Sequence, residues 1–225
     1  MDMNKAPNQT VCSILFNILL AAFSLFVNGF GVYLTIHASI GAGPWDVFNL
    51  GISRTFGILY GNASIAVSFT VLILDILLRE PIGIAMFIDA VTVGKSVDLF
   101  NYLALVPVPD TLFGSIVMLF VGLVIIGYTQ YLYMRASLGC GPRDTLLVGL
   151  KRRCRTLPIG AVSVLLLSAV TLAGYLLGGP VGIGTLLFAL CSGPIMQFAF
   201  RTVHFDATSV RHQNLFDSLR IILRR

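Results

Sequence analysis

The sequence predicts an all-α, polytopic transmembrane bundle made of two homologous three-span repeats. Composition is the first reason: of 225 residues, 56% are hydrophobic and only 11% are charged. The mean hydropathy is +0.90. Ordinary soluble domains carry roughly 25% charged residues, and a soluble fold of this size could not bury so much apolar surface. Lipid is therefore the expected solvent. The second reason is an internal repeat that places residues 136–144 in register with 38–46.

Six apolar runs are long enough to span a hydrocarbon core, which takes roughly 20 helical residues. The breaks between them hold residues that end helices, such as Pro81, Pro107 and Pro180. The first run is too long for the apolar part of a signal peptide, so we expect it to be retained. The runs lie near 11–36, 59–78, 82–105, 111–134, 158–177 and 180–201.

Two further stretches, 38–57 and 136–157, follow the first and fourth runs and hold too few apolar residues to cross a bilayer alone. Each opens with a glycine-rich turn and continues as a short apolar helix followed by basic residues. We predict a short broken or re-entrant helix in each stretch. An alternative with eight crossings, in which both stretches span, is also compatible with the sequence.

The two short stretches carry the repeat. Residues 38–46 read Ala-Ser-Ile-Gly-Ala-Gly-Pro-Trp-Asp, and residues 136–144 read Ala-Ser-Leu-Gly-Cys-Gly-Pro-Arg-Asp, 98 positions later. Matches continue on both sides, with the offset rising to 99 after one inserted residue. They include Gly29 with Gly127, Gly51 with Gly149, Arg54 with Arg152, Pro81 with Pro180 and Gly83 with Gly182. Such self-similarity fixes the domain organisation: a first repeat over 1–105, a second over 106–205 and a tail over 206–225.

Three spans per half is an odd number, so the second half is expected to enter the membrane upside down. Inverted repeats of this kind are typical of secondary transporters. Lys and Arg cluster in 135–157 and in the tail, whereas 106–110 and 178–180 contain neither. The positive-inside rule then places both termini in the cytoplasm of a plasma-membrane protein. The tail itself is expected to form an amphipathic helix on that leaflet.

The paired Gly-x-Gly-Pro-x-Asp motif is the main candidate for a solute site. Its glycines permit a sharp turn, its proline suits the first position of a helix, and its aspartate favours the helix dipole. Broken helices with free N–H groups mark transport sites, although the motif could also be only a capped helix start. The predicted substrate-binding residues in the two motifs are Gly41, Gly43, Pro44, Trp45, Asp46, Gly139, Gly141, Pro142, Arg143 and Asp144.

Five more residues are predicted to contribute to substrate binding. Asp89, Lys95 and Asp98 lie in the third run, where charges are costly unless they pair or face water. Lys95 and Asp98 are three residues apart on one helix face and are expected to pair, which leaves a purely structural role open. Tyr33 and Tyr131 occupy equivalent positions near the motifs, as hydroxyl ligands or as interfacial belt residues.

Several other side chains have structural interpretations. Arg143 can hold an anion bidentately, or it is one more cytoplasmic cation. Asp75 is expected to pair with Arg79 four residues later. Small residues in the first and fourth runs permit close helix packing; they are Gly29, Gly31, Gly122 and Gly127.

No catalytic or phosphate-loop motif occurs in the sequence, so we predict neither an enzyme nor a bound cofactor. The four cysteines lack metal-ligand spacing, and no metal site is expected. The net charge of +5 comes from residues at the ends of apolar runs rather than from a basic face. Nucleic acid is therefore not an expected partner.

The doubled motif in a small six-span chain resembles the YczE/YyaS/YitT family of bacterial membrane proteins. The resemblance runs from about Val11 to Arg201 and rests on Gly41 to Asp46 and Gly139 to Asp144. The soluble C-terminal domain of the YitT branch is absent, so the chain looks more like the YczE branch. The resemblance implies a bacterial plasma-membrane protein and supplies no substrate.

We expect a transporter or channel-like protein for a small polar solute, with an anionic solute suggested by Arg143 and the helix N-termini. The alternative is an accessory protein that docks a cytoplasmic partner through residues 151–155 and the tail. A membrane-embedded enzyme is the third option. The sequence leaves open whether the chain forms a homo-oligomer in the bilayer.

Overall fold

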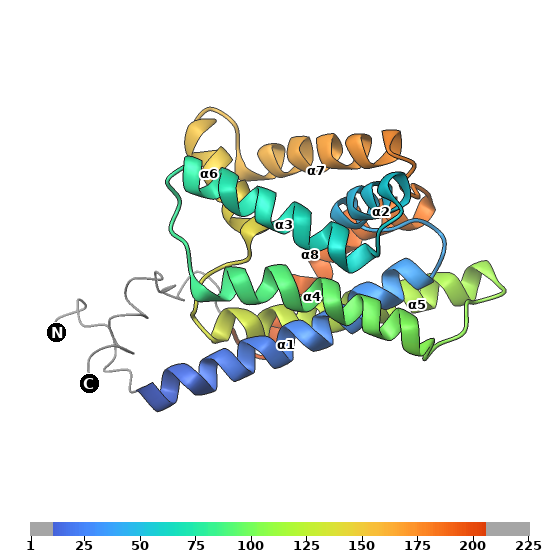
Figure 1. The fold of residues 1–225 in the computed structure, drawn as a ribbon, viewed down its shortest axis with the longest axis horizontal. Helices are drawn as coiled ribbons and strands as arrows, with labels where there is room; N and C mark the ends of the chain where they lie inside the picture. Colours follow the sequence, from blue (N-terminus) through green and yellow to red (C-terminus); the bar gives the residue numbers. More distant parts are fainter. Residues whose placement is uncertain (1–10, 206–225) are drawn as a thin grey trace.

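The computed structural model describes residues 11–205, which form eight α-helices and no strand (Figure 1). The helices are α1 Val11–His37, α2 Pro44–Phe56, α3 Tyr60–Leu77, α4 Ile84–Leu103, α5 Leu112–Arg135, α6 Pro142–Arg153, α7 Ile159–Leu176 and α8 Ile183–Thr202. A long helix, a short helix and two helices of 18 and 20 residues follow one another twice. The helix predicted for the tail lies outside the described residues.

Within residues 11–205, five helices are long and apolar enough to cross a membrane: α1, α3, α5, α7 and α8. Their outward faces are apolar, as shown by Leu19, Leu77 and Leu176, which are 69%, 70% and 75% exposed. Exposed apolar surface on this scale is stable against lipid rather than water. The predicted helical membrane protein is thereby confirmed.

The remaining helices are α2, α4 and α6. The short helices α2 and α6 have 13 and 12 residues, so they reach about 20 Å, short of the roughly 30 Å of a hydrocarbon core. Helix α4 has 20 residues but carries Asp89, Lys95 and Asp98. Its place as the third span stays a prediction.

Helices α1 and α5 cross at the centre of the molecule and run in opposite directions (Figure 1). A Cβ on Gly31 would lie 2.9 Å from the carbonyl oxygen of Gly122, and one on Gly122 would lie 2.7 Å from that of Gly31. Close by, Asn28 Nδ2 donates to Thr129 Oγ1 at 2.9 Å. The predicted close packing through small residues is therefore present at this crossing.

The other helices pack both within and across the two halves of the chain: α4 on α1 and α8 on α5 stay within a half, whereas the two short helices pack across. Helix α4 lies along α1, and α8 lies along α5. Helix α2 packs against α7, while α6 packs against α3. A Cβ on Gly51 of α2 would lie 2.6 Å from the carbonyl oxygen of Gly174 on α7. Each short helix is thus seated on the third helix of the opposite half.

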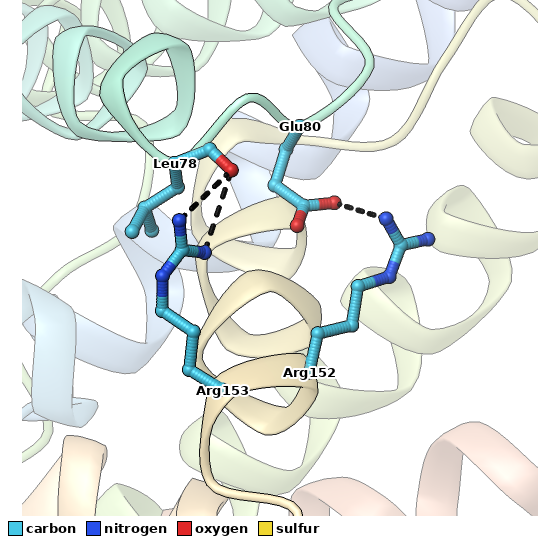
Figure 2. Close-up of polar contacts among 4 residues, drawn as sticks. All are labelled: Leu78, Glu80, Arg152 and Arg153. Carbon is cyan, nitrogen blue, oxygen red and sulfur yellow. Dashed lines mark hydrogen bonds and ion pairs between the residues drawn. The ribbon is translucent and has the colours of Figure 1, made fainter.

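The C-terminal end of α6 is hydrogen-bonded to residues 78–81, which connect α3 and α4 and are called the first corner below (Figure 2). Arg152 Nη1 donates to Glu80 Oε2 at 2.9 Å, and Arg153 donates to the carbonyl oxygen of Leu78 at 3.3 and 3.4 Å. The Glu80 side chain is 3% exposed, whereas that of Arg152 is 63% exposed. This is the one ion pair between side chains of residues 11–205.

The C-terminal end of α2 is fastened to the second corner, residues 177–180 between α7 and α8, at the other end of the molecule (Figure 1). Arg54 Nη1 donates to the carbonyl oxygen of Gly178 at 2.7 Å. Thr55 Oγ1 donates to that of Leu177 at 3.0 Å. The two corners therefore bind the short helices in similar ways, but only the first uses opposite charges.

The predicted pair between Asp75 and Arg79 is wrong. Helix α3 ends at Leu77, and Arg79 has a φ of 56°, so these two residues do not share one helix face. Asp75 is fully buried, and neither carboxylate oxygen has a hydrogen-bond partner among residues 11–205.

Candidate functional site

Both motifs turn the chain through the same backbone conformations. Ser39 and Gly41 have φ values of 56° and 115°, and the equivalent Ser137 and Gly139 have 57° and 122°. A φ near 115–122° is rarely adopted by residues with a side chain, which explains the glycines at 41 and 139. The two turns are conformational copies of each other.

Each motif loop docks on the start of a helix from the other half. The Gly184 amide of α8 donates to the Ile40 carbonyl oxygen at 2.8 Å, and the Ala85 amide of α4 donates to that of Leu138 at 3.2 Å. These bonds give an acceptor to backbone N–H groups that would otherwise be unpaired at the start of a helix. They hold the loops against α8 and α4 and so fix where α2 and α6 begin.

The helix starts agree with the motif prediction. Pro44 and Pro142 open α2 and α6, and Asp46 and Asp144 lie in the first turns. The N-cap residues are Gly43 and Gly141, which have no side chain to accept a hydrogen bond from the first turn. The first-turn N–H groups of α2 and α6 are therefore without a cap from the N-cap side chain.

The starts of α2 and α6 meet at a cavity of about 400 Å³ in the middle of the bundle. This volume is that of a small-molecule site. All eight helices contribute to its wall. Seven motif residues line it: Gly43, Pro44, Trp45, Asp46, Gly141, Arg143 and Asp144. Other polar groups come from Asn28, Ser64, Ser68, Asp89, Gln130, Ser163 and Ser192.

Trp45 and Arg143, which occupy the equivalent position in the two motifs, contact each other across the cavity. The guanidinium carbon of Arg143 lies 5.2 Å from the centroid of the Trp45 ring, a cation–π distance. Arg143 Nη2 also donates to Ser64 Oγ at 3.3 Å. Among residues 11–205 Arg143 forms no ion pair. Its charge is held by an aromatic face and a hydroxyl group.

Asp46 is 5% exposed and accepts a hydrogen bond from the Tyr60 hydroxyl at 2.7 Å. Asn49 Nδ2 donates to the same hydroxyl at 3.4 Å. Burial raises the pKa of Asp46, while the charge of Arg143 and the bond from Tyr60 act in the opposite direction. This carboxyl group is thus already bound within the protein.

Asp89 and Asp144 form a second acidic region at the start of α6. Their Oδ2 atoms lie 2.9 and 3.8 Å from the position of a Cβ on Gly141. Gln130 Nε2 donates to Asp144 at 3.4 Å, whereas Asp89 has no hydrogen bond or ion pair with any residue in 11–205. Asp144 is exposed at the cavity, and partial desolvation by the surrounding helices raises its pKa, while Arg143 and Gln130 act in the opposite direction.

The start of α2 faces a different group. Phe188 occupies the position equivalent to Asp89, and its Cζ lies 2.9 Å from the Cβ position on Gly43. Asp89 stands at the matching place beside Gly141. The two broken-helix starts are therefore alike in backbone, but one meets a carboxylate and the other an aromatic ring.

Three predicted motif residues do not line the cavity. Gly41 and Gly139 pack against Gly182 and Gly83, and Pro142 is fully buried. Their place is in the turns that position α2 and α6. A part for them in solute binding stays a prediction.

The predicted pair between Lys95 and Asp98 is wrong. Lys95 Nζ donates to Asn62 Oδ1 at 2.8 Å on the exposed side of α4. Asp98 Oδ1 accepts instead from the backbone amide of Gly61 at 2.8 Å. Unpaired amides at the start of α3 compete with Lys95 for this carboxylate. Neither side chain lines the cavity.

The two predicted tyrosines also lie away from the cavity. The Tyr33 hydroxyl donates to the Val106 carbonyl oxygen at 3.4 Å. The Tyr131 hydroxyl accepts from Arg135 at 3.2 Å, and its ring packs against Phe205. Sequence reasoning missed Ser64, Gln130 and Phe188. Of these, only Phe188 carries a signal, because it replaces Asp89 in the repeat.

A sequence family of unknown function, DUF6198, matches residues 15–201. The chain belongs to this family. The match extends from the second turn of α1 almost to the end of α8, so the DUF6198 region includes every wall of the cavity.

Three bacterial proteins are similar to this DUF6198 chain over most of its length. The uncharacterized membrane protein YczE of Bacillus subtilis is 32% identical over 78% of this chain and 81% of its own length. An uncharacterized protein of Haemophilus influenzae is 32% identical over 78% and 79%, and B. subtilis YyaS is 25% identical over 80% and 89%. The resemblance to YczE and YyaS is confirmed, while kinship with YitT stays a prediction. No solved structure matches the chain.

Proposed function

We propose that this DUF6198 protein is a transporter that moves a small polar solute through the central cavity. The observation that carries the proposal is the meeting of two broken-helix starts, from α2 and α6, at one cavity walled by both halves of the chain. Secondary transporters bind their solutes between repeats at interrupted helices. An accessory protein that only docks a partner has no need of such a cavity.

Inverted repeats are part of this proposal. The antiparallel crossing of α1 and α5 supports them (Figure 1). The hydrogen bond from Gly184 to Ile40 has a counterpart from Ala85 to Leu138, at positions shifted by the repeat offset. Contacts that recur after exchange of the two halves indicate a two-fold axis, and the antiparallel course of the equivalent helices α1 and α5 (Figure 1) favours an axis in the membrane plane.

The proposed topology has six crossings, with α4 as the third, and both termini in the cytoplasm. The last turn of α6 and the connection to α7 carry Lys151, Arg152, Arg153 and Arg155, whereas the equivalent residues 53–57 contain only Arg54. The positive-inside rule places the basic connection in the cytoplasm of a bacterial cell. Residues 53–57 then lie on the external side.

Accessibility of two equivalent positions tests this topology. Phe56 and Cys154 lie at the ends of α2 and α6, and both are exposed. We expect Phe56→Cys, in a chain without other cysteines, to react with a membrane-impermeant maleimide in intact cells. A chain that retains only Cys154 is expected to react only after the membrane is opened. Reaction of both positions from the same side would rule out the inverted arrangement.

Access to the cavity tests transport itself. Ser192 of α8 lines the cavity, and we expect Ser192→Cys to react with a small hydrophilic thiol reagent from either side of oriented vesicles. Alternating access predicts this result because each state opens the cavity to one side. Thr171→Cys, on α7 and not in the cavity wall, is the matched control and is expected to stay unreactive. A Ser192→Cys variant that reacts from neither side would contradict the transport proposal.

A further inference from the structure

We propose that the solute is a small organic ammonium ion with an apolar tail, whose charged head binds between Asp89 and Asp144. This inference rests on the proposed function, because it uses the same cavity. The juxtaposition that carries it is the acidic pair beside Gly141 and the aromatic ring of Phe188 beside Gly43, on the walls of one cavity.

The charges that line the cavity favour a cation. Three carboxylates, from Asp46, Asp89 and Asp144, face a single guanidinium group from Arg143. Arg143 is bound to Trp45 and Ser64, and Asp46 is bound to Tyr60. Arg143 also acts electrostatically on Asp89 and Asp144, but it forms an ion pair with neither, so one positive charge is shared among three carboxylates. In a region of low dielectric constant, this excess negative charge attracts cations and repels the anion suggested by the sequence.

The start of α6 offsets only part of this negative charge. A helix N-terminus is equivalent to about half a positive charge, whereas two carboxylates lie beside Gly141. Asp89 also lacks any hydrogen-bond donor among residues 11–205. An ammonium group supplies both the missing charge and up to three N–H donors to these oxygens.

The apolar tail of the proposed solute is inferred from the first motif, at the start of α2. Phe188 replaces the carboxylate at the equivalent position, so the cavity is acidic at one helix start and aromatic at the other. An inorganic cation has no apolar part that could contact the Phe188 ring. The described residues also contain no group of three His, Cys, Asp or Glu side chains placed to hold a metal ion. A solute with a charged head and an apolar body fits both features.

Protection from thiol labelling tests the inference with defined probes. In the Ser192→Cys variant without other cysteines, we expect n-pentylammonium to slow labelling and n-pentanoate to have no effect. Methylammonium should bind more than about tenfold more weakly, because each buried methylene contributes about a fourfold gain in affinity. Asp89→Asn should weaken protection by n-pentylammonium more than about tenfold. Asp110→Asn, which removes an exposed carboxylate between α4 and α5, should leave it unchanged.

The outcomes separate this inference from the proposed function. If Ser192→Cys cannot be labelled from either side, the transport proposal fails and the inference fails with it. If labelling occurs but n-pentanoate protects, or neither probe protects, only the ammonium inference is overturned. If Asp89→Asn lowers the melting temperature but leaves protection intact, Asp89 only offsets the charge of the α6 N-terminus, which also overturns the inference.

Discussion

Replacement of Gly83 by valine is expected to prevent the chain from folding into a stable, monodisperse protein. Gly83 caps α4, and a Cβ there would overlap the carbonyl oxygen of Leu138 and lie 2.7 Å from the Cα of Gly139. Its φ of −109° suits any residue, so the damage comes from contact with the motif loop of the other half. We expect a loss of more than about 3 kcal/mol of stability. Thermal unfolding and size-exclusion profiles in detergent would measure it.

Two further glycine variants make this prediction specific. Gly182 is the equivalent of Gly83, and a Cβ there would overlap the Ile40 carbonyl oxygen, so Gly182→Val should be as harmful. Gly160 of α7 has no neighbouring atom within 4 Å of its Cβ position, so Gly160→Val should be tolerated. Equal yield and melting temperature for Gly83→Val and Gly160→Val would show that the loop does not dock on α4.

The second large effect is expected from Arg152→Ala. The Glu80 side chain is 3% exposed, and without Arg152 its charge would be left buried and unpaired (Figure 2). A buried charged group without its partner costs about 1–3 kcal/mol or more. The larger cost of breaking a fully buried pair does not apply, because Arg152 is 63% exposed. The melting temperature in detergent would report this loss.

The equivalent arginine supplies the matched control. Arg54 donates to the neutral carbonyl oxygen of Gly178, so Arg54→Ala should cost only about 1 kcal/mol or less. Adding Glu80→Gln to Arg152→Ala should restore part of the lost stability, because the unpaired charge is removed. If Arg54→Ala were as harmful as Arg152→Ala, or if Glu80→Gln restored nothing, the charge at the first corner would not be the cause.

The short helices could be predicted from the sequence because their boundaries depend on local chemistry. The turns before Pro44 and Pro142 need a glycine at a positive φ, and proline then fixes the first helical residue. Both features are visible in adjacent residues, and the repeat shows each of them twice. The same signals brought Asp46 and Asp144 into the candidate site, and both line the cavity.

Contacts between distant helices could not be predicted in this way. Helical spacing favoured a Lys95–Asp98 pair, but the amide of Gly61 on α3 binds Asp98 instead. That competitor becomes visible only when the α3–α4 packing is known. The contact between Trp45 and Arg143 depends likewise on two helix starts that are far apart in the sequence. Interhelical geometry therefore decided the parts of the site that the sequence left open.

The docking of the motif loops also sets an order for the maturation of the chain during synthesis. When Leu138 leaves the ribosome, Ala85 has already been made, and the second loop can dock at once. The first loop must wait from Ile40 until Gly184 is made, roughly 7–29 s at about 5–20 residues per second. During that interval the first loop and the unfinished start of α2 depend on water, lipid head groups or the insertion machinery for their hydrogen bonds. The N-terminal half therefore completes its contacts only when the last helix of the chain has been made.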